Sequence, residues 1–180
     1  MKKFIALLRG INVSGQKQIK MSELKTLFEE AGFQDSETYI QSGNVIFSSK
    51  KKPPAKISEI ISSAVKMKFG FDVQVIVVIP DELEYIVKNN PFIKKNKESE
   101  KLYIIFLSSI PSKENLAKLK AIDYLPEEFI VDNRNIYLFV PNGYGKAKLN
   151  NNFFEKKLNV YATTRNLRTI KALLEMVSSN

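Results

Sequence analysis

Apolar positions along the first 80 residues of the chain repeat with two different spacings. Residues 4–8 and 73–79 form continuous apolar runs of strand length, and residues 38–41 and 45–48 flank a short turn centred on Gly43. The order of these elements and of two intervening helices, β-α-β-β-α-β, predicts a ferredoxin-like domain over residues 1–80. The helices are indicated by apolar residues at i, i+3, i+4 and i+7, namely Leu24, Leu27, Phe28 and Ala31, and then Ile57, Ile60, Ile61, Ala64 and Val65.

The last of these runs, residues 73–79, is apolar on both sides of the predicted strand. Val75 and Val77 would face one side. Ile76 and Val78 would face the other. A strand of this kind is typical of a sheet that is covered on both faces. Because the helices of a ferredoxin-like domain cover one face only, we expect the second half of the chain to cover the other, with a dimer partner as the alternative.

Residues 81–180 have the mixed periodicity of a second, smaller α+β domain. Pro80-Asp81 begins a helix with a D-x-x-E capping pattern, and residues 91–101 are predicted to be an exposed linker. We detect no internal sequence repeat. The expected fold class is α+β with two domains, 1–80 and 81–180. The second domain has the predicted order β-α-β-β-α-α: a strand at 102–107, a helix with Leu116 and Leu119, a hairpin of 129–131 and 136–140, a short helix with Phe154 and Leu158, and a final helix from about 165 to 177.

The composition excludes several kinds of chemistry. The 180 residues include no His and no Cys, so a Ser–His triad, a thiol nucleophile and the usual zinc ligand sets cannot form within one chain. No motif predicts a cofactor or a metal. The apolar run at 4–8 is too short for a signal peptide, and no segment is long enough to cross a membrane. We therefore expect a cytoplasmic protein that does not bind membranes.

The net charge of +9 is concentrated in the second half of the chain. Between residues 144 and 171, seven basic side chains stand against Glu155 alone. A local field of this sign attracts phosphates, nucleic acid or acidic metabolites. The acidic pairs elsewhere, such as Glu127-Glu128, are interpreted as solvated surface or turn residues.

Two loops in the first domain combine glycine with polar side chains at the ends of apolar strands. In Arg9-Gly10-Ile11-Asn12, the guanidinium could bind a carboxylate or phosphate through two hydrogen bonds. Alternatively, Arg9 pairs with a local acid and Asn12 caps the turn. In Gln41-Ser42-Gly43-Asn44, hairpin chemistry alone explains Gly43 and Asn44 but leaves Gln41 unexplained. Both interpretations stay open at this point.

Two further candidates lie in the second domain. Residues 142–148 form a glycine loop with Lys146 and Lys148, but Ala147 stands where a phosphate-binding P-loop needs a hydroxyl. Nucleotide hydrolysis of the P-loop kind is therefore not expected, whereas anion binding remains open. Thr163-Thr164-Arg165-Asn166 is predicted to begin the last helix, with a threonine cap and an anion site at the same helix end.

Three separated stretches, LLRGINVSG (7–15), TYIQSGNVIF (38–47) and ATTRNLRTI (162–170), resemble the hallmark motifs of a bacterial family of conserved hypothetical proteins, the domain of unknown function 1697. The resemblance covers essentially the whole chain. It implies a ferredoxin-like domain followed by a smaller α+β domain, and it supplies no reaction. Two positions depart from the family pattern: Ala147 replaces a serine, and Leu167 stands where tryptophan is common.

These observations lead to a predicted ligand-binding protein whose cleft between the two domains holds a phosphorylated or carboxylated small molecule, such as a nucleotide. One alternative is an RNA-binding module that stacks bases on Tyr39 and Phe47, and another is a non-catalytic interaction protein. The residues assign no catalytic group, leave open whether the protein is an enzyme, and predict no oligomeric state. The predicted ligand-binding residues are Arg9, Asn12, Gln41, Ser42, Asn44, Lys146, Lys148, Thr164, Arg165 and Asn166.

Overall fold

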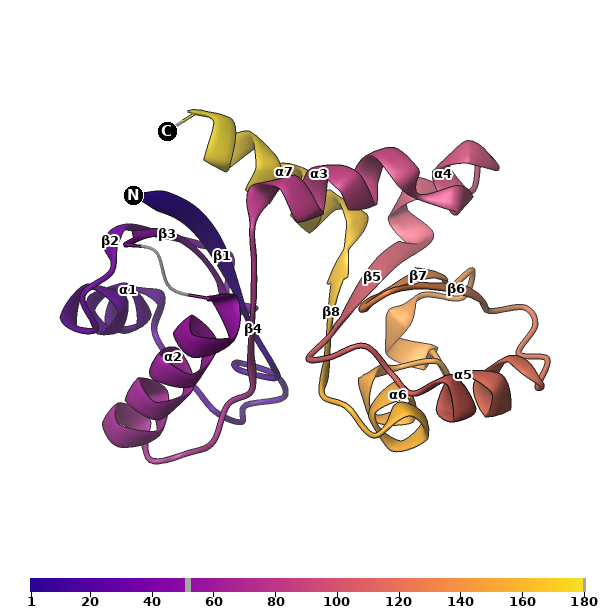
Figure 1. Ribbon diagram of the computed structural model, residues 1–180, viewed down its shortest axis with the longest axis horizontal. Helices are drawn as coiled ribbons and strands as arrows, with labels where there is room; N and C mark the ends of the chain where they lie inside the picture. The colour runs from indigo at the N-terminus through magenta and orange to yellow at the C-terminus, as the bar shows by residue number, and fades with distance from the viewer. Residues whose placement is uncertain (51–52, 180) are drawn as a thin grey trace. The chain divides into compact units, whose positions relative to one another are not determined.

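The computed structural model describes residues 1–50 and 53–179, which divide into two compact units (Figure 1). The first unit contains Met1–Glu84 together with Leu173–Asn180, and the second contains Tyr85–Ala172. Each unit combines helices with one four-stranded antiparallel sheet. The predicted α+β class is therefore confirmed.

The sheet of the first unit has the strand order β2-β3-β1-β4, with β1 and β3 at its centre. Every neighbouring pair of strands is antiparallel. Between Gln34 and Glu37, β2 contains an extra residue relative to β3, which is a β-bulge. Along the chain the elements are β1 (Lys2–Leu8), α1 (Met21–Glu30), β2 (Gln34–Tyr39), β3 (Asn44–Ser49), α2 (Pro54–Phe69) and β4 (Val75–Val78).

Both faces of this first sheet are buried along most of β1 and along β3 and β4, whereas the edge strand β2 is largely exposed. On one face, α1 and α2 pack over a core that contains Phe28 and Phe47, whose ring centroids lie 5.2 Å apart. On the other face, Ile76 and Val78 are also almost fully buried. The ammonium of Lys3 donates to the carbonyl oxygen of Val177 (2.8 Å), so the last turns of the C-terminal helix lie beside the start of β1. The strand that was apolar on both sides is thus covered on both sides.

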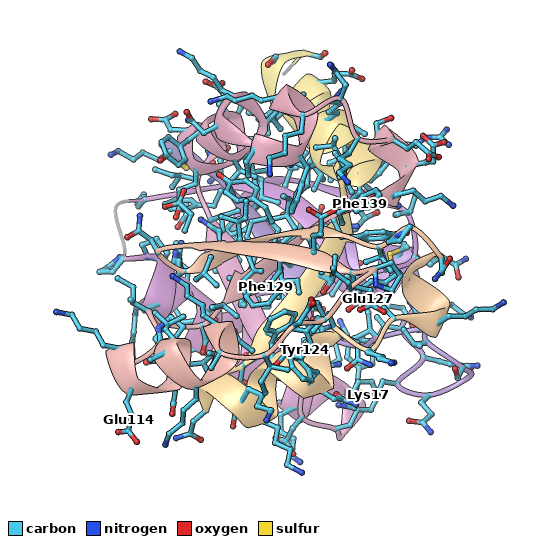
Figure 2. The ribbon with its side chains drawn as sticks, turned by 90° about the vertical axis from the view of Figure 1, so that its right-hand side faces the viewer. Lys17, Glu114, Tyr124, Glu127, Phe129 and Phe139 are labelled. Carbon is cyan, nitrogen blue, oxygen red and sulfur yellow. The ribbon has the colours of Figure 1, made fainter. Side chains whose placement is uncertain are left out.

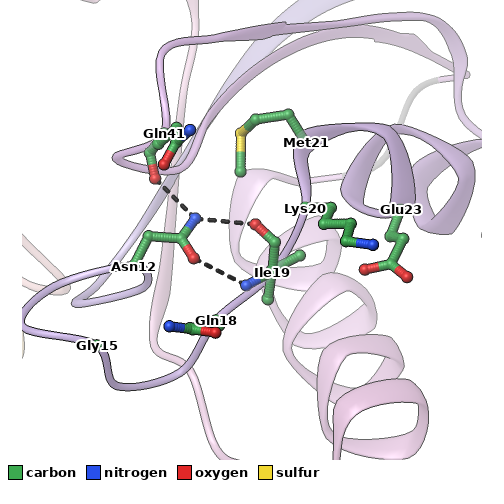
Figure 3. Close-up of a pocket in the computed structure, with 8 residues that line it drawn as sticks. All are labelled: Asn12, Gly15, Gln18, Ile19, Lys20, Met21, Glu23 and Gln41. Atoms are coloured by element: carbon green, nitrogen blue, oxygen red, sulfur yellow. Dashed lines mark hydrogen bonds between the residues drawn. The ribbon is translucent and has the colours of Figure 1, made fainter.

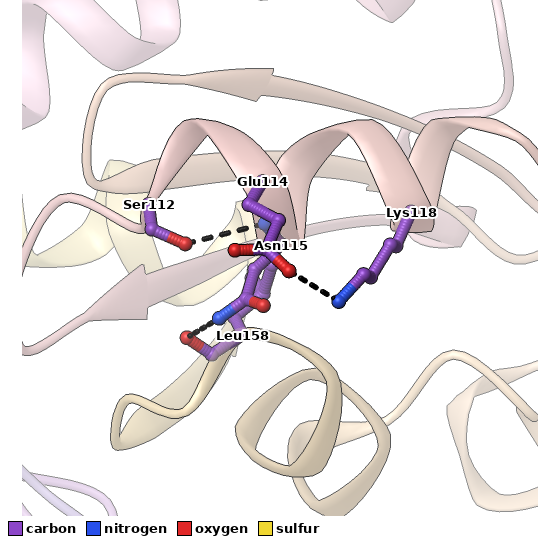
Figure 4. A network of polar contacts seen from close by, with 5 residues as sticks. All are labelled: Ser112, Glu114, Asn115, Lys118 and Leu158. Atoms are coloured by element: carbon purple, nitrogen blue, oxygen red, sulfur yellow. Dashed lines mark hydrogen bonds and ion pairs between the residues drawn. The ribbon is translucent and has the colours of Figure 1, made fainter.

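The sheet of the second unit has the order β6-β7-β5-β8. Helices α5 and α6 cover one face, and Asn115 of α5 joins them by donating to the carbonyl oxygen of Leu158 (3.2 Å; Figure 4). Ser112 caps α5 by accepting from the N–H of Asn115. The elements are α3 (Pro80–Asn89), which starts in the first unit, α4 (Pro91–Lys94), a 3-10 turn (Ser99–Lys101), β5 (Leu102–Leu107), α5 (Lys113–Lys120), β6 (Glu128–Asp132), β7 (Asn135–Phe139), a 3-10 turn (Tyr144–Lys146), α6 (Asn151–Leu158), β8 (Ala162–Asn166) and α7 (Leu167–Ser179).

One prediction for the second half was wrong. The order β-α-β-β-α-α omitted β8, whose backbone pairs with β5 along its whole length, from Leu107 opposite Ala162 to Tyr103 opposite Asn166. The β-branched threonines of this segment suit a strand, but its polar composition suggested a helix cap. The segment 91–101, predicted to be an exposed linker, includes α4, where the side chain of Phe92 is fully buried, while six of its eleven residues are exposed.

With β8 in place, the second unit contains the series β-α-β-β-α-β, the same series as the first unit. The two sheets also share one strand order, because β5, β6, β7 and β8 occupy the places of β1, β2, β3 and β4. The repeat that the sequence did not reveal is therefore present in the topology. Among the described residues, no helix is long and apolar enough to cross a membrane.

Candidate functional site

The loop between β1 and α1 has an unusual backbone. Five of its residues between positions 10 and 17 have positive φ values of 47–74°. Ser14 and Gly15 form a two-residue turn, closed by a bond from the N–H of Gln16 to the carbonyl oxygen of Val13 (3.0 Å). Left-handed residues other than glycine are uncommon, and clusters of them occur where a structure holds a loop in one functional shape. The five residues are Gly10, Asn12, Ser14, Gly15 and Lys17.

Asn12 fixes this loop to its surroundings (Figure 3). Its Nδ2 donates to the carbonyl oxygens of Ile19 and Gln41, both at 2.9 Å, and its Oδ1 accepts the N–H of Ile19 at 2.8 Å. One amide therefore joins the two ends of the loop and ties them to the tip of the β2–β3 hairpin. The predicted capping role of Asn12 understated these contacts, because one of its partners lies 29 residues away.

We expect Asn12→Gly to lower the free energy of unfolding by about 2 kcal/mol, because glycine keeps the left-handed backbone and removes only the side-chain bonds. Urea unfolding of the full chain measures this change. Asn133→Gly is the matched control: Asn133 also has a positive φ, but its exposed side chain reaches no further than the neighbouring Asp132 among the described residues (3.2 Å), so its replacement should change stability by less than about 0.5 kcal/mol. Equal losses in the two variants would contradict the role given to Asn12.

A pocket of about 400 Å³ lies between this loop, the start of α1 and the hairpin tip (Figure 3). Lys20 is the N-cap residue of α1 and carries no side-chain acceptor for the N–H groups of the first turn. These N–H groups and the Lys20 ammonium are favourable to an anion, whereas the carboxylate of Glu23 is not. The pocket is lined by Asn12, Gly15, Gln18, Ile19, Lys20, Met21, Glu23 and Gln41.

The hairpin tip beside the pocket is also tightly constrained. Ile40 has a φ of 48°, which is rare for a β-branched residue, and about half of its side chain is exposed. Asn44 is fully buried and donates to the carbonyl oxygen of Tyr39 and to Oγ of Ser42, both at 3.0 Å. Ser42 and Asn44 therefore hold the turn, while Gln41 lines the pocket.

Arg9 follows the last residue of β1, as predicted, and is half-buried. Its backbone N–H donates to the carbonyl oxygen of Gln74 (2.8 Å), which fixes the chain where it leaves the sheet. Of the five predicted residues in the first unit, Asn12 and Gln41 line the pocket. Gln18, Lys20 and Glu23 also line it and were not predicted. The unusual loop before them, with Asn12 and Gly15, was the available signal.

In the second unit, the glycine loop already binds a carboxylate of its own chain. Glu127, labelled in Figure 2, is largely buried. Its two oxygens accept the N–H groups of Lys148 (2.9 Å) and Leu149 (2.8 Å). The N–H groups of Lys146 and Ala147 donate to carbonyl oxygens within the loop. The interpretation of Glu127 as a solvated acid was wrong. These N–H groups are therefore occupied, whereas the side chains of Lys146 and Lys148 are exposed and could contact an external anion.

The residues predicted to cap the last helix lie instead on β8. Thr164 accepts from the hydroxyl of Tyr144 (2.9 Å) and donates to Oδ1 of Asn151 (2.7 Å). The cap of α7 is Asn166, whose Oδ1 accepts the N–H of Thr169 (2.7 Å), and not a threonine. Asn166 lies at the end of a strand that sequence periodicity did not detect.

Arg165 is buried on the same strand. Its guanidinium donates to Oγ1 of Thr163 (2.9 Å) and to the carbonyl oxygen of Thr164 (2.7 Å). Burial lowers the pKa of Arg165 to about 10, and nearby Tyr144 acts in the opposite direction, so the side chain stays charged at neutral pH. Across residues 1–50 and 53–179, no three acidic side chains gather as a metal-binding group.

Comparison with known proteins identifies the family. The model of a family described as protein of unknown function, DUF1697, matches residues 1–137. The solved structure of the conserved bacterial protein SP0830 from Streptococcus pneumoniae is similar, with a TM-score of 0.75 and 21% identity over 97% of each chain, which shows a shared fold. No functionally curated protein matches the chain. Because the family match spans most of its length, this chain belongs to the DUF1697 family of proteins of unknown function.

Proposed function

We propose that the first unit binds a small molecule bearing a phosphate or carboxylate group, in the pocket between the 10–20 loop and the β2–β3 hairpin tip. The observation that carries this proposal is the cluster of left-handed residues around the pocket, held in place by Asn12. Left-handed non-glycine residues cost about 1 kcal/mol or more each, and they tend to persist where a binding site is held ready for its ligand.

The lining residues support an anionic ligand with a polar body. The anionic group would lie at the start of α1, near Lys20 and the first-turn N–H groups. The exposed amides of Gln18 and Gln41 offer both donors and acceptors to the rest of the ligand. A volume of about 400 Å³ lies within the range of small-molecule pockets. A nucleotide or a sugar phosphate fits this description.

The two charged residues of the pocket, Lys20 and Glu23, allow a test of whether the ligand's charge is negative. For an anion, Lys20→Gln is expected to weaken binding by about two- to fivefold, and Glu23→Gln is expected to strengthen it by a similar factor. Isothermal titration with AMP, glucose 6-phosphate and citrate, at two salt concentrations, measures both changes. Both variants should remain folded, because both side chains are exposed.

Matched controls separate a local effect from a change in net charge. Lys95→Gln and Glu100→Gln remove exposed charges from the second unit and should leave the affinity unchanged. If the pocket variants change the affinity in the same direction as each other, or no more than these controls, the anion proposal fails.

The RNA-binding alternative has little support from the first sheet. Phe47 is fully buried against Phe28 and Phe33, and Tyr39 is half-buried, so these rings are not offered together for base stacking. A strongly salt-dependent shift in thermal stability with short RNA alone would favour that alternative. If neither RNA nor any of the small anions changes the thermal stability, the result would favour a non-catalytic interaction protein.

We further infer that the first unit is a ferredoxin-like domain. Its series β-α-β-β-α-β, its antiparallel strand order β2-β3-β1-β4 and the two helices on one face support this inference. The same series in the second unit extends the inference to that unit.

A further inference from the structure

We propose that the β-bulge of β2 forms a second binding site, for a small zwitterion such as a free α-amino acid. The site is a polar pocket of about 650 Å³ in the first unit, with a lining different from that of the anion pocket. Its polar lining consists of Lys3, Lys25, Asp35, Ser36, Glu37 and Ser48.

The bulge determines which side chains reach this pocket. Gln34 pairs with Ser48 and Glu37 pairs with Ile46, so three steps along β2 match two steps along β3. Asp35, within the bulge, has a φ of 52°. Bulges are frequent beside functional sites because they turn a side chain in a direction that a regular strand cannot provide.

Ser36 is the buried polar residue of this pocket. Its side chain is buried, with only 5% of the residue exposed, and its Oγ has no hydrogen-bond partner among the described residues. Ser36 also lines the pocket. A buried hydroxyl without a partner destabilises a protein, so buried hydroxyls are almost always paired. The Oγ atom is itself covered in this structure, so a polar group of a ligand in the pocket would supply the partner that Ser36 lacks after a rotation of the Ser36 side chain towards the pocket.

The charges around Ser36 indicate the class of ligand. Two ammonium groups, from Lys3 and Lys25, and two carboxylates, from Asp35 and Glu37, line the pocket, and the Lys25 ammonium also forms an exposed ion pair with Glu29 (4.0 Å). The Lys3 ammonium is held by the carbonyl oxygen of Val177, and this bond uses one of its three hydrogens. Opposite charges in one pocket match a ligand that carries an ammonium and a carboxylate together, and they disfavour a ligand with net charge.

The experiment is a ¹H–¹⁵N chemical-shift titration of the full chain with L-alanine, propionate and propylamine. Alanine carries both charges, and the other two probes carry one each. We expect saturable shifts at the amides of residues 35–37 with alanine, weaker shifts there with the other two, and no alanine-dependent shifts at residues 12–23. Equal responses to alanine and propionate, or no saturable response to alanine, would overturn the proposal. Because the anion pocket is read out at separate amides, the two proposals can fail independently.

Ser36→Ala tests whether the Ser36 hydroxyl binds a ligand or is only an unpaired buried group that destabilises the fold. The variant is expected to raise the thermal midpoint of the ligand-free protein, because it removes an unpaired buried hydroxyl, and to weaken alanine binding by about two- to tenfold. Ser63→Ala, at an exposed position of α2, should change neither quantity. Asp35→Asn, also exposed, is a second variant that should weaken alanine binding without loss of the fold. Undiminished binding in both Ser36→Ala and Asp35→Asn would refute the site.

Discussion

Replacement of Gly43 by alanine is expected to lower the free energy of unfolding by about 2–4 kcal/mol. A Cβ atom at this position would lie 2.8 Å from Cβ of Leu8 and 2.9 Å from two side-chain carbons of Ile11, all in the core of the first unit. Gly43 also has a φ of 77°, which side chains rarely adopt, and its carbonyl oxygen accepts the N–H of Leu8 (2.8 Å). The tip of the β2–β3 hairpin cannot move away from the clash without breaking the hydrogen bond between Leu8 and Gly43.

Urea unfolding of Gly43→Ala and Gly32→Ala separates the steric clash of the added Cβ from the strain of a positive φ. Gly32 has a similar φ of 84°, but an added Cβ would meet nothing within 4 Å. Gly32→Ala should therefore show the backbone strain alone, about 1 kcal/mol. If both variants lose the same stability, close packing at Gly43 is not the reason for a glycine there.

Replacement of Glu127 by alanine is expected to lower the free energy of unfolding by about 2–5 kcal/mol. The change removes both acceptors for the N–H groups of Lys148 and Leu149 in a largely buried place. Unpaired buried donors cost about 1–3 kcal/mol each. Glu127→Gln keeps one acceptor oxygen and directs an amide NH₂ at the other N–H, so we expect an intermediate loss.

Glu128 provides the control for this experiment in the adjacent position. Its carboxylate forms an ion pair with Lys97 (2.7 Å), and both side chains are about 30% exposed. Such a pair contributes about 1 kcal/mol or less, so Glu128→Gln should have a small effect. Thermal or urea unfolding that gives equal losses for the two glutamates would contradict the role of Glu127 as the organiser of the glycine loop.

The sequence predicted those elements whose signal is local. The helices with Leu24–Ala31 spacing and with Ile57–Val65 spacing appear as α1 and α2, because periodic apolar residues determine both the helix and its buried face. Strand β8 was missed because its stability comes from pairing with β5, about 60 residues earlier in the chain. Its own composition, with Thr163, Thr164 and Asn166, resembles a helix cap.

The candidate site shows the same difference between residues with a local sequence signal and residues placed by long-range contacts. Asn12 and Gln41 were predicted to bind ligand because each belongs to a short polar stretch with a glycine at the end of a strand, and both line the pocket. Lys20 and Glu23 were not predicted, because their place at the pocket depends on how the loop folds back on α1. The role of Glu127 likewise depends on backbone groups 21 and 22 residues away.

The central claim is that the first unit holds a small anion at the start of α1. The most direct measurement is ¹H–¹⁵N chemical-shift mapping of the full chain with inorganic phosphate, AMP, glucose 6-phosphate and citrate. We expect at least one of these to give saturable shifts centred on residues 12–23 and on Gln41, with smaller shifts in Lys20→Gln at the same ligand concentration. Saturable shifts that avoid these residues for every ligand, or an absence of saturable shifts throughout the chain, would contradict the claim.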